Sequence, residues 1–364
     1  MSIVKLKYEL LLSGIYPFEG EYEKSGFKIV KKQITEETLN HLSKAGAIYF
    51  SPYILVCSYL DVNNNLVYLA FEREETIDID YTNTNEYDVK TTNKFIEKKW
   101  QEDNVESLEQ ILTLTINNDI KLPVKIVTAY KDDGTFLTIK ADFIKTNAAS
   151  LLCNDRNVTL ERIKRQNNRL SSNFDYGKII ELRHNNPYYD NALSLFYSSY
   201  SVNEETIGFT LLISALEAIF SKSTYDKVDV CSECSQKMYK IRQSVSQNVS
   251  KILLDEDNSI CKKVKNFYDK RSAFLHEGKR NINTEDYYAL QEYVRNVLLM
   301  YWYISMNIDS YVHKDIIKEI QSDNVQQKFM YKNFLTGLDN TSFKEKQVKM
   351  IYDSIKAVLE GKAP

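Results

Sequence analysis

Glycine, proline and cysteine are all scarce in this chain, and each shortage excludes a class of protein. Only 10 Gly and 5 Pro occur among 364 residues, and neither GxGxxG nor GxxxxGK[ST] is present. Dinucleotide-binding and P-loop phosphate sites are therefore not expected. The 5 Cys are an odd number scattered over a long chain, which is not a disulfide framework. They predict a reducing, cytoplasmic location.

Long apolar runs and an excess of one charge are also missing. The longest apolar run, residues 297–306, is far shorter than the ~18 residues that a membrane span needs, so no membrane association is expected. Lys5, Lys7 and Glu9 interrupt what would be the apolar core of a signal peptide. With 47 basic and 50 acidic residues the net charge is −3, so any contact with nucleic acid has to be local.

The first half of the sequence combines strand and helix patterns. One hairpin is expected from residues 47–60 and 66–71, which flank an asparagine turn, and another from residues 124–130 and 135–144, which flank Lys-Asp-Asp-Gly. A short helix is expected between the hairpins, over residues 93–101. The fold class is therefore α+β, and residues 1–185 form a mixed region that is a candidate sensor or substrate-selecting domain.

The second half reads as helical from Pro187 onward. Residues 204–220 are apolar almost all round and predict a buried helix. Apolar stripes predict three more helices, over residues 237–254 (with Met238 in its stripe), 259–276 and 284–304. A capping box predicts a fifth helical segment, over residues 342–359. Residues 186–310 are predicted to form a helical domain, and residues 311–364 a C-terminal helical extension.

One helix carries the residues that suggest chemistry. Arg271 falls near the centre of the apolar stripe of residues 259–276, and a guanidinium in such a place must be paired. His276 follows near the helix C-terminus, where the helix dipole favours an imidazolium. An arginine that stabilises charge on phosphate and a histidine that moves protons are what phosphodiester cleavage without a metal needs.

This arrangement resembles the HEPN superfamily. An Arg followed four to six positions later by a His resembles its motif, and the segments LLISALEAIF, YKIRQSVSQNVSKIL and NFYDKRSAFLHEGK are most similar to its Apea-like group, over roughly residues 190–310. The resemblance implies a metal-independent endoribonuclease, with Arg271 binding phosphate and His276 as general acid or base. It also implies an RNA substrate, 2′,3′-cyclic phosphate and 5′-hydroxyl products, and a toxin or phage-defence context with a regulatory protein partner. Ser272 is a supporting residue that can only donate or accept a hydrogen bond.

Two questions about this motif stay open in the sequence. Five positions turn an α-helix by ~140°, so Arg271 and His276 do not share a face unless the last turn unwinds near Gly278. Otherwise the site is composite, with Arg and His from two copies, which predicts a homodimer. Arg271 also has a structural alternative, because Glu217 is the lone acid in the apolar part of residues 204–220 and can form an ion pair with it. The protein would then be a non-catalytic dimerisation or binding module.

No metal or other cofactor is expected. Cys231 and Cys234 form a single CxxC, whereas structural zinc usually takes four ligands from two such pairs. A redox role for the pair lacks the βαβ context that thioredoxin-like motifs have.

Overall fold

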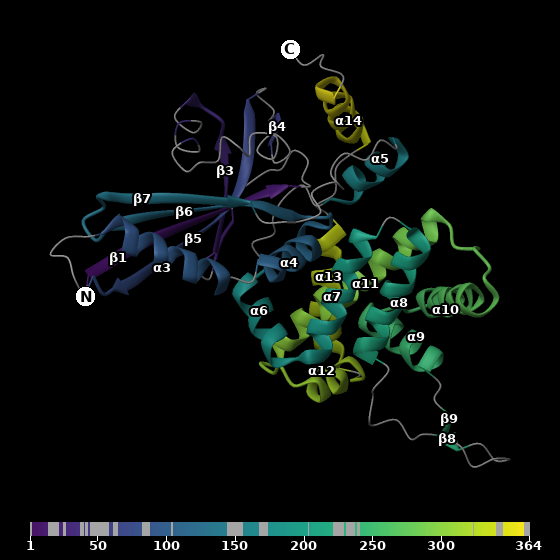
Figure 1. Cartoon of the computed structure of the whole chain (residues 1–364). Coiled ribbons are helices and arrows are strands. Elements are labelled where there is room, and N and C mark those ends of the chain that lie inside the picture. Colours follow the sequence, from purple (N-terminus) through teal and green to yellow (C-terminus); the bar gives the residue numbers. More distant parts are fainter. Residues whose placement is uncertain are drawn as a thin grey trace. The chain divides into compact units, whose positions relative to one another are not determined.

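The computed structural model divides the chain into two compact units (Figure 1). One unit comprises residues 1–177 and 341–364, and the other comprises residues 178–340. The structure describes residues 2–13, 22–24, 27–36, 40, 43, 58–60, 65–81, 88–102, 105–143, 156–166, 174–202, 204–220, 229–230, 237–238, 241–322, 324–339 and 345–359. The units are described one at a time.

The first unit is built on an antiparallel sheet of seven strands. They are β1 (Ser2–Ser13), β2 (Tyr22–Lys24), β3 (Phe27–Gln33), β4 (Ser58–Leu60), β5 (Leu66–Ile79), β6 (Lys121–Lys131) and β7 (Phe136–Phe143). Their order is β2-β3-β5-β1-β6-β7, and β4 pairs with the start of β5. The long central strands β1 and β5 run in register from the pair Ser2 and Ile79 to the pair Leu11 and Ala70.

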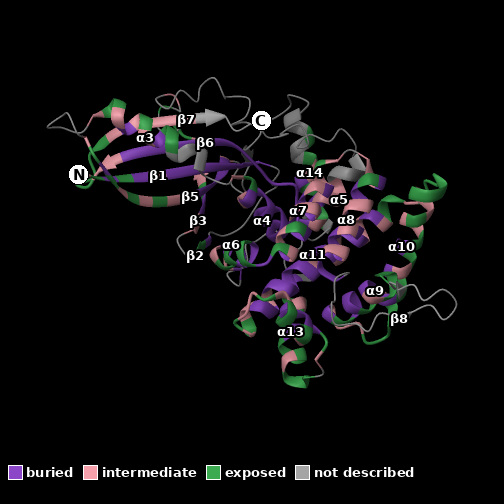
Figure 2. Cartoon of the chain, turned by 60° about the horizontal axis from the view of Figure 1, so that its bottom comes forward, coloured by how far each residue is buried: buried purple, intermediate pink, exposed green. Residues whose placement is uncertain are grey.

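Each face of the sheet buries its own apolar cluster, because side chains alternate between the faces of a strand. Helix α3 (Val89–Glu102) covers the face that carries Leu6, Tyr8 and Val127, and Ile96 of the helix packs among them. The opposite face carries the cluster of Leu11, Val30, Tyr68, Ala70, Val124 and Ile126. Figure 2 shows the resulting burial along β1 and β6.

A charged cluster interrupts this second face. Glu9 of β1 lies directly opposite Glu72 of β5, and both carboxylates are almost fully buried. The ammonium group of Lys32 contacts Glu9 and lies 2.6 Å from Oε1 of Glu72, to which Lys7 also approaches within 3.3 Å. The two carboxylates raise the pKa of Lys32 against the opposing effect of its burial. Lys32 and Lys7 together therefore offset the charge of two acids that would otherwise repel each other.

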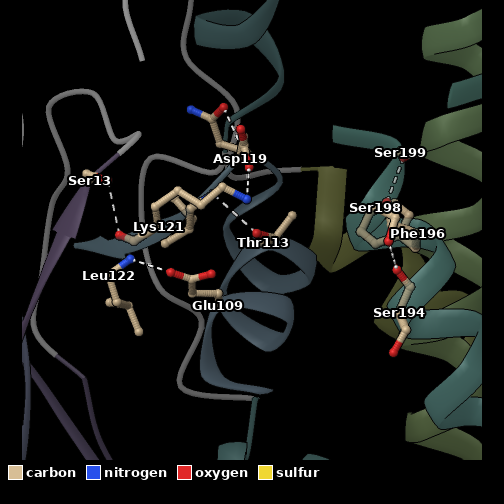
Figure 3. Close-up of polar contacts among 12 residues, drawn as sticks. Ser13, Glu109, Thr113, Asp119, Lys121, Leu122, Ser194, Phe196, Ser198 and Ser199 are labelled. Carbon is tan, nitrogen blue, oxygen red and sulfur yellow. Dashed lines mark hydrogen bonds and ion pairs between the residues drawn. The ribbon is translucent and has the colours of Figure 1, made fainter. Parts of the chain in front are cut away.

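Buried polar contacts join the sheet to α4 (Val105–Ile116) (Figure 3). Glu109 of the helix accepts a hydrogen bond from the backbone N–H of Leu122 at 2.7 Å, and Asp119 pairs with Lys121 at 2.9 Å. The hydroxyl of Ser13 donates to the carbonyl of Lys121 at 3.1 Å. These contacts satisfy polar groups where the chain passes from α4 into β6.

Two more helices complete the first unit. α5 (Arg156–Arg165) and α14 (Glu345–Leu359) pack together through Ile163, Val348 and Ile351. Residues 311–364, which the sequence grouped as one extension, are thus shared by both units, because α14 lies in the first unit and α12 and α13 in the second.

The second unit is a helical bundle around α8. Its elements are α6 (Tyr176–Asn185, which spans the boundary), α7 (Pro187–Ser201), α8 (Glu205–Phe220), β8 (Asp229–Val230), β9 (Lys237–Met238), α9 (Ile241–Ile252), α10 (Ser259–Glu277), α11 (Thr284–Asn307), α12 (His313–Ile320) and α13 (Val325–Asp339). α8 packs against α7, α9, α10 and α11. The mostly apolar surface of α8 suits a helix that packs against four neighbours.

Close packing of α8 depends on Gly208. A Cβ atom at this position would lie 2.8 Å from Cε2 of Tyr287 and 3.1 Å from the carbonyl oxygen of Ser199. Tyr287 of α11 also donates its hydroxyl hydrogen to that carbonyl at 2.8 Å. The glycine therefore lets α7, α8 and α11 approach each other where the chain enters α8.

The predicted fold class and most of the predicted elements are confirmed. The chain is α+β, β6 and β7 form the second predicted hairpin, and α3, α8, α10 and α11 begin and end within a few residues of their predicted bounds. In the first hairpin β4 pairs with β5 as expected, whereas residues 47–57 lie outside the described part of the chain, as do residues 342–344 of the predicted capping box.

Two predictions about element bounds are wrong. β5 continues to Ile79, eight residues beyond the predicted strand, because it pairs with nearly the whole of β1. The second half is not entirely helical: Met238, predicted in a helix, lies in β9, which pairs with β8, and α9 begins only at Ile241. The predicted start of α11 at Thr284 is confirmed, and the side chain of Asn283 caps the helix by accepting a hydrogen bond from the backbone N–H of Asp286.

We expect Gly208→Ala to lower the free energy of unfolding by about 1–3 kcal/mol, because its methyl group would collide with Tyr287 and a backbone carbonyl. Gly337→Ala is the matched control. A Cβ atom there meets nothing within 4 Å, so helix propensity alone should stabilise α13 by about 0.5–1 kcal/mol. Urea unfolding measures both changes, and a neutral or stabilising Gly208→Ala would contradict the packing described.

We expect Lys32→Met to lower the free energy of unfolding by about 3 kcal/mol at pH 7, because Glu9 and Glu72 lose their shared counter-ion. Protonation of one carboxylate relieves the repulsion, so the loss should be smaller at pH 4. Lys31→Met, at an exposed lysine of the same strand whose side chain lies on the other face of the sheet, is the control and should stay within about 0.5 kcal/mol. Equal losses for Lys32→Met at both pH values would contradict this account.

Candidate active site

The predicted motif lies in the last third of α10, which is regular to its end. Asp255 caps the start of the helix by accepting hydrogen bonds from the backbone N–H groups of Ser259 and Cys261. Gly278 ends the helix with φ 67°, and its N–H and that of Lys279 bond to the carbonyls of Phe274 and Ala273. This is a glycine C-cap of the Schellman type, and it follows a helix that stays intact through Glu277.

The apolar stripe of α10 is buried only in its first part. Val264, Phe267 and Tyr268 are buried, whereas Phe274 is half-buried and Leu275 is 48% exposed. Figure 2 shows α10 largely in the colours of intermediate and exposed residues. The expectation that Arg271 sits at the centre of a buried face is therefore wrong, because the helix has begun to leave the core at this point.

Arg271 is half-buried and faces Glu217 of α8. The side chains are 27% and 24% exposed, and NH2 of the guanidinium lies 3.9 Å from Oε2 of the carboxylate. The predicted ion pair is thus present, although this separation is too long for a hydrogen bond. Nε of Arg271 is buried and has no hydrogen-bond partner among the described residues.

Tyr268 is a third member of this cluster, and the sequence analysis missed it. Its side chain is one helical turn before Arg271 and is 7% exposed, and its hydroxyl faces the carboxylate of Glu217. Burial and the negative charge of Glu217 raise the pKa of Tyr268, so the phenol stays protonated. The signal available in the sequence was its place on the same helix face as Arg271, but a tyrosine there is also an ordinary core residue.

His276 and Arg271 do not meet within one copy of the chain. His276 is exposed in the last turn of α10. Because the helix does not unwind, five residues place it ~7.5 Å along the axis and ~140° around it from Arg271. Of the two arrangements left open by the sequence, the unwound helix is excluded, and a site that joins the two residues has to be composite.

The other cations near the end of α10 are more closely paired than Arg271. Lys270 bonds to Asp286, Arg242 lies 2.5 Å from Asp269, and Lys279 lies 2.6 Å from Glu277. Arg280 lies 3.4 Å from Glu204. Local charge is therefore almost balanced, and Arg271 has the longest of these ion pairs.

The remaining predicted residues contribute little to this geometry. Ser272 is exposed beside Arg271. Cys231 and Cys234 lie outside the described residues. Within the ranges that the structure describes, no three His, Cys, Asp or Glu side chains gather as metal ligands, and Cys261 is a buried free thiol.

His313 is a second histidine with an unusual environment. Its Nδ1 lies 2.7 Å from the hydroxyl of Tyr301, to which Asn186 donates a hydrogen bond, and its ring stacks on Tyr188 at 4.0 Å. Burial lowers the pKa of His313 to about 4. The neutral ring holds the start of α12 against Tyr188 of α7 and Tyr301 of α11, so His313 has a structural role.

Comparisons with known proteins do not identify a family. No protein-family model matches the chain, and no match was found among curated proteins or solved structures. The resemblance seen in the sequence therefore stays a prediction. None of the described helices is long and apolar enough to cross a membrane.

Protonation of His313 should destabilise the protein in mild acid. The pKa is about 4 in the folded chain and near 6.5 when unfolded, so the stability contributed by the neutral ring is present above pH 6.5 and is lost between pH 6.5 and pH 4. His313→Phe keeps a stacking ring without the titration and should flatten this part of the stability profile. Urea unfolding from pH 7.5 to 4.5 measures it, with His184→Gln, at an exposed position, as the control. Parallel profiles for wild type and His313→Phe would refute the assignment.

Proposed function

We propose that the protein is a metal-independent endoribonuclease of HEPN type that acts as a homodimer. The observation that supports this best is the state of Arg271: a guanidinium that is partly exposed, loosely paired, and left with an unbonded Nε. Such a group can bind a phosphate oxygen without first breaking a close hydrogen bond.

The proposed reaction is transesterification of RNA. A 2′-hydroxyl attacks the adjacent phosphorus, Arg271 stabilises the charge that develops on the phosphate oxygens, and His276 transfers a proton. Because the two residues diverge on α10, Arg271 of one copy works with His276 of a second copy. The products carry a 2′,3′-cyclic phosphate and a 5′-hydroxyl, and the sheet-based unit selects substrate or senses a trigger in a toxin or phage-defence setting.

A non-catalytic role is the second candidate, and the Arg271–Glu217 contact favours it. An ion pair between α8 and α10 can fix their register without any chemistry. In that case the helical unit serves only for dimerisation or for binding a partner.

RNA cleavage in a chelator distinguishes the two candidates. We expect wild-type protein to cleave mixed RNAs in EDTA, and Arg271→Ala and His276→Ala to lose at least about 100-fold in rate while remaining folded. An equal mixture of the two variants should recover about a quarter of the wild-type rate, because half of the dimers then hold one intact composite site.

The control is Arg242→Ala, which removes an exposed cation that is bound to Asp269 and should leave the rate within about twofold. Wild-type protein that cleaves no RNA in any condition would favour the binding module. Cleavage by wild type without recovery in the mixture would contradict the composite site.

A further inference from the structure

Glu217 occupies a place that the proposed reaction does not yet explain. Beyond its first turn α8 carries no other charged residue, and this one lies on the side where α10 passes. Its carboxylate faces both Arg271 and Tyr268 of α10. A helix enclosed by four others has a charge only where the enclosure is incomplete, and Glu217 is accordingly 24% exposed.

The contacts within this cluster are incomplete as well. The guanidinium and the carboxylate are 3.9 Å apart, and Nε of Arg271 is buried without a hydrogen-bond partner among the described residues. Buried polar atoms in native proteins are almost always bonded. A donor and an acceptor that lie side by side without a close hydrogen bond between them are therefore the sign of a place that a ligand with both kinds of group completes.

A ribonucleotide linkage has both kinds of group. Its phosphate oxygens accept hydrogen bonds, and the 2′-hydroxyl next to the phosphorus donates one. A general base has to reach that hydroxyl at about 3 Å, so it must lie within a few ångströms of the cation that holds the phosphate. Glu217 meets this requirement within one copy of the chain, whereas His276 of the same copy does not.

We propose that Glu217 is the general base of the reaction, and that Tyr268 is a positioning residue for it; this inference rests on the proposed function. The 2′-oxygen transfers its proton to the Glu217 carboxylate and forms a bond to phosphorus. The bond from phosphorus to the 5′-oxygen breaks, and that oxygen takes a proton from the His276 imidazolium of the second copy. Tyr268 donates its hydroxyl hydrogen to the carboxylate and holds its orientation.

The dependence of rate on pH tests the base directly. A carboxylate base works only when ionised, so the wild-type kcat should fall in acid. Glu217→Gln keeps the shape of the side chain but cannot accept the proton, so it should lower kcat by about 10²–10⁴-fold, leave KM within a few-fold, and abolish the fall in acid. Glu217→Asp should be slow but keep that fall, and Tyr268→Phe should shift it with a smaller loss of rate.

Mixed dimers test which copy supplies the base. Glu217→Gln mixed with His276→Ala should recover activity, because one site then has Glu217 and Arg271 from one copy and His276 from the other. Glu217→Gln mixed with Arg271→Ala should recover no activity. Each site takes both Glu217 and Arg271 from one copy, and every copy in this mixture lacks one of these residues. Asp269→Asn removes one negative charge from an exposed position of α10 and is the control, with an expected rate within about twofold of wild type.

The outcomes separate this inference from the proposal on which it rests. Suppose that wild type cleaves RNA and that the rate of Glu217→Gln still falls in acid. Glu217 is then a structural partner of Arg271 and the inference is wrong. The same conclusion follows if Glu217→Gln lowers the melting temperature and kcat together but leaves the pH profile unchanged. If wild type cleaves no RNA, the endoribonuclease proposal and the inference fail together.

Discussion

The enclosure of α8 by four other helices is the constraint on which the helical unit depends. A helix buried on all sides excludes charge, because an unpaired ionic group loses its hydration there. Close approach of the helices at Gly208 shows how little space the enclosure leaves at one end. Near the other end Glu217 is 24% exposed on the side that faces Arg271, while its neighbours Leu216 and Ile219 are buried. The position of the candidate site thus follows from the one side on which this part of α8 is not fully covered.

The sequence predicted those parts of the fold that depend on local periodicity. The apolar pattern of α8 and the turn before β7 are strong signals, and the structure agrees with both. The predicted start of α9 was wrong because Met238 fits the apolar pattern of a helix and that of a strand equally well. Only its pairing with Asp229 shows that it belongs to a strand. The length of β5 depends in the same way on its partner β1, which is remote in the sequence.

The sequence was enough to predict two residues of the candidate site, Arg271 and Glu217, but not how exposed or how closely paired they are. Arg271 and Glu217 are charged residues within otherwise apolar helix patterns. Their pairing could be predicted because a charge in such a place needs a partner of opposite sign. How far each side chain is exposed depends on the point at which α10 leaves the bundle, which no periodicity encodes. Tyr268 could not be singled out for a different reason: a tyrosine on a core face is ordinary, and only its position beside the Glu217 carboxylate makes it notable.

Balanced charge around α10 bears on how the proposed enzyme would hold RNA. A protein that grips many phosphates releases many counter-ions and binds strongly at low salt. Here the neighbouring cations Lys270, Lys279 and Arg280 each have an acidic partner at a shorter distance than Arg271 has, so the end of α10 carries little unpaired positive charge. Affinity for RNA would then come from a few short-range contacts, not from a long-range field. On the proposed function, such a site would act on RNA that is presented in a defined shape, and a second copy of the chain would complete it.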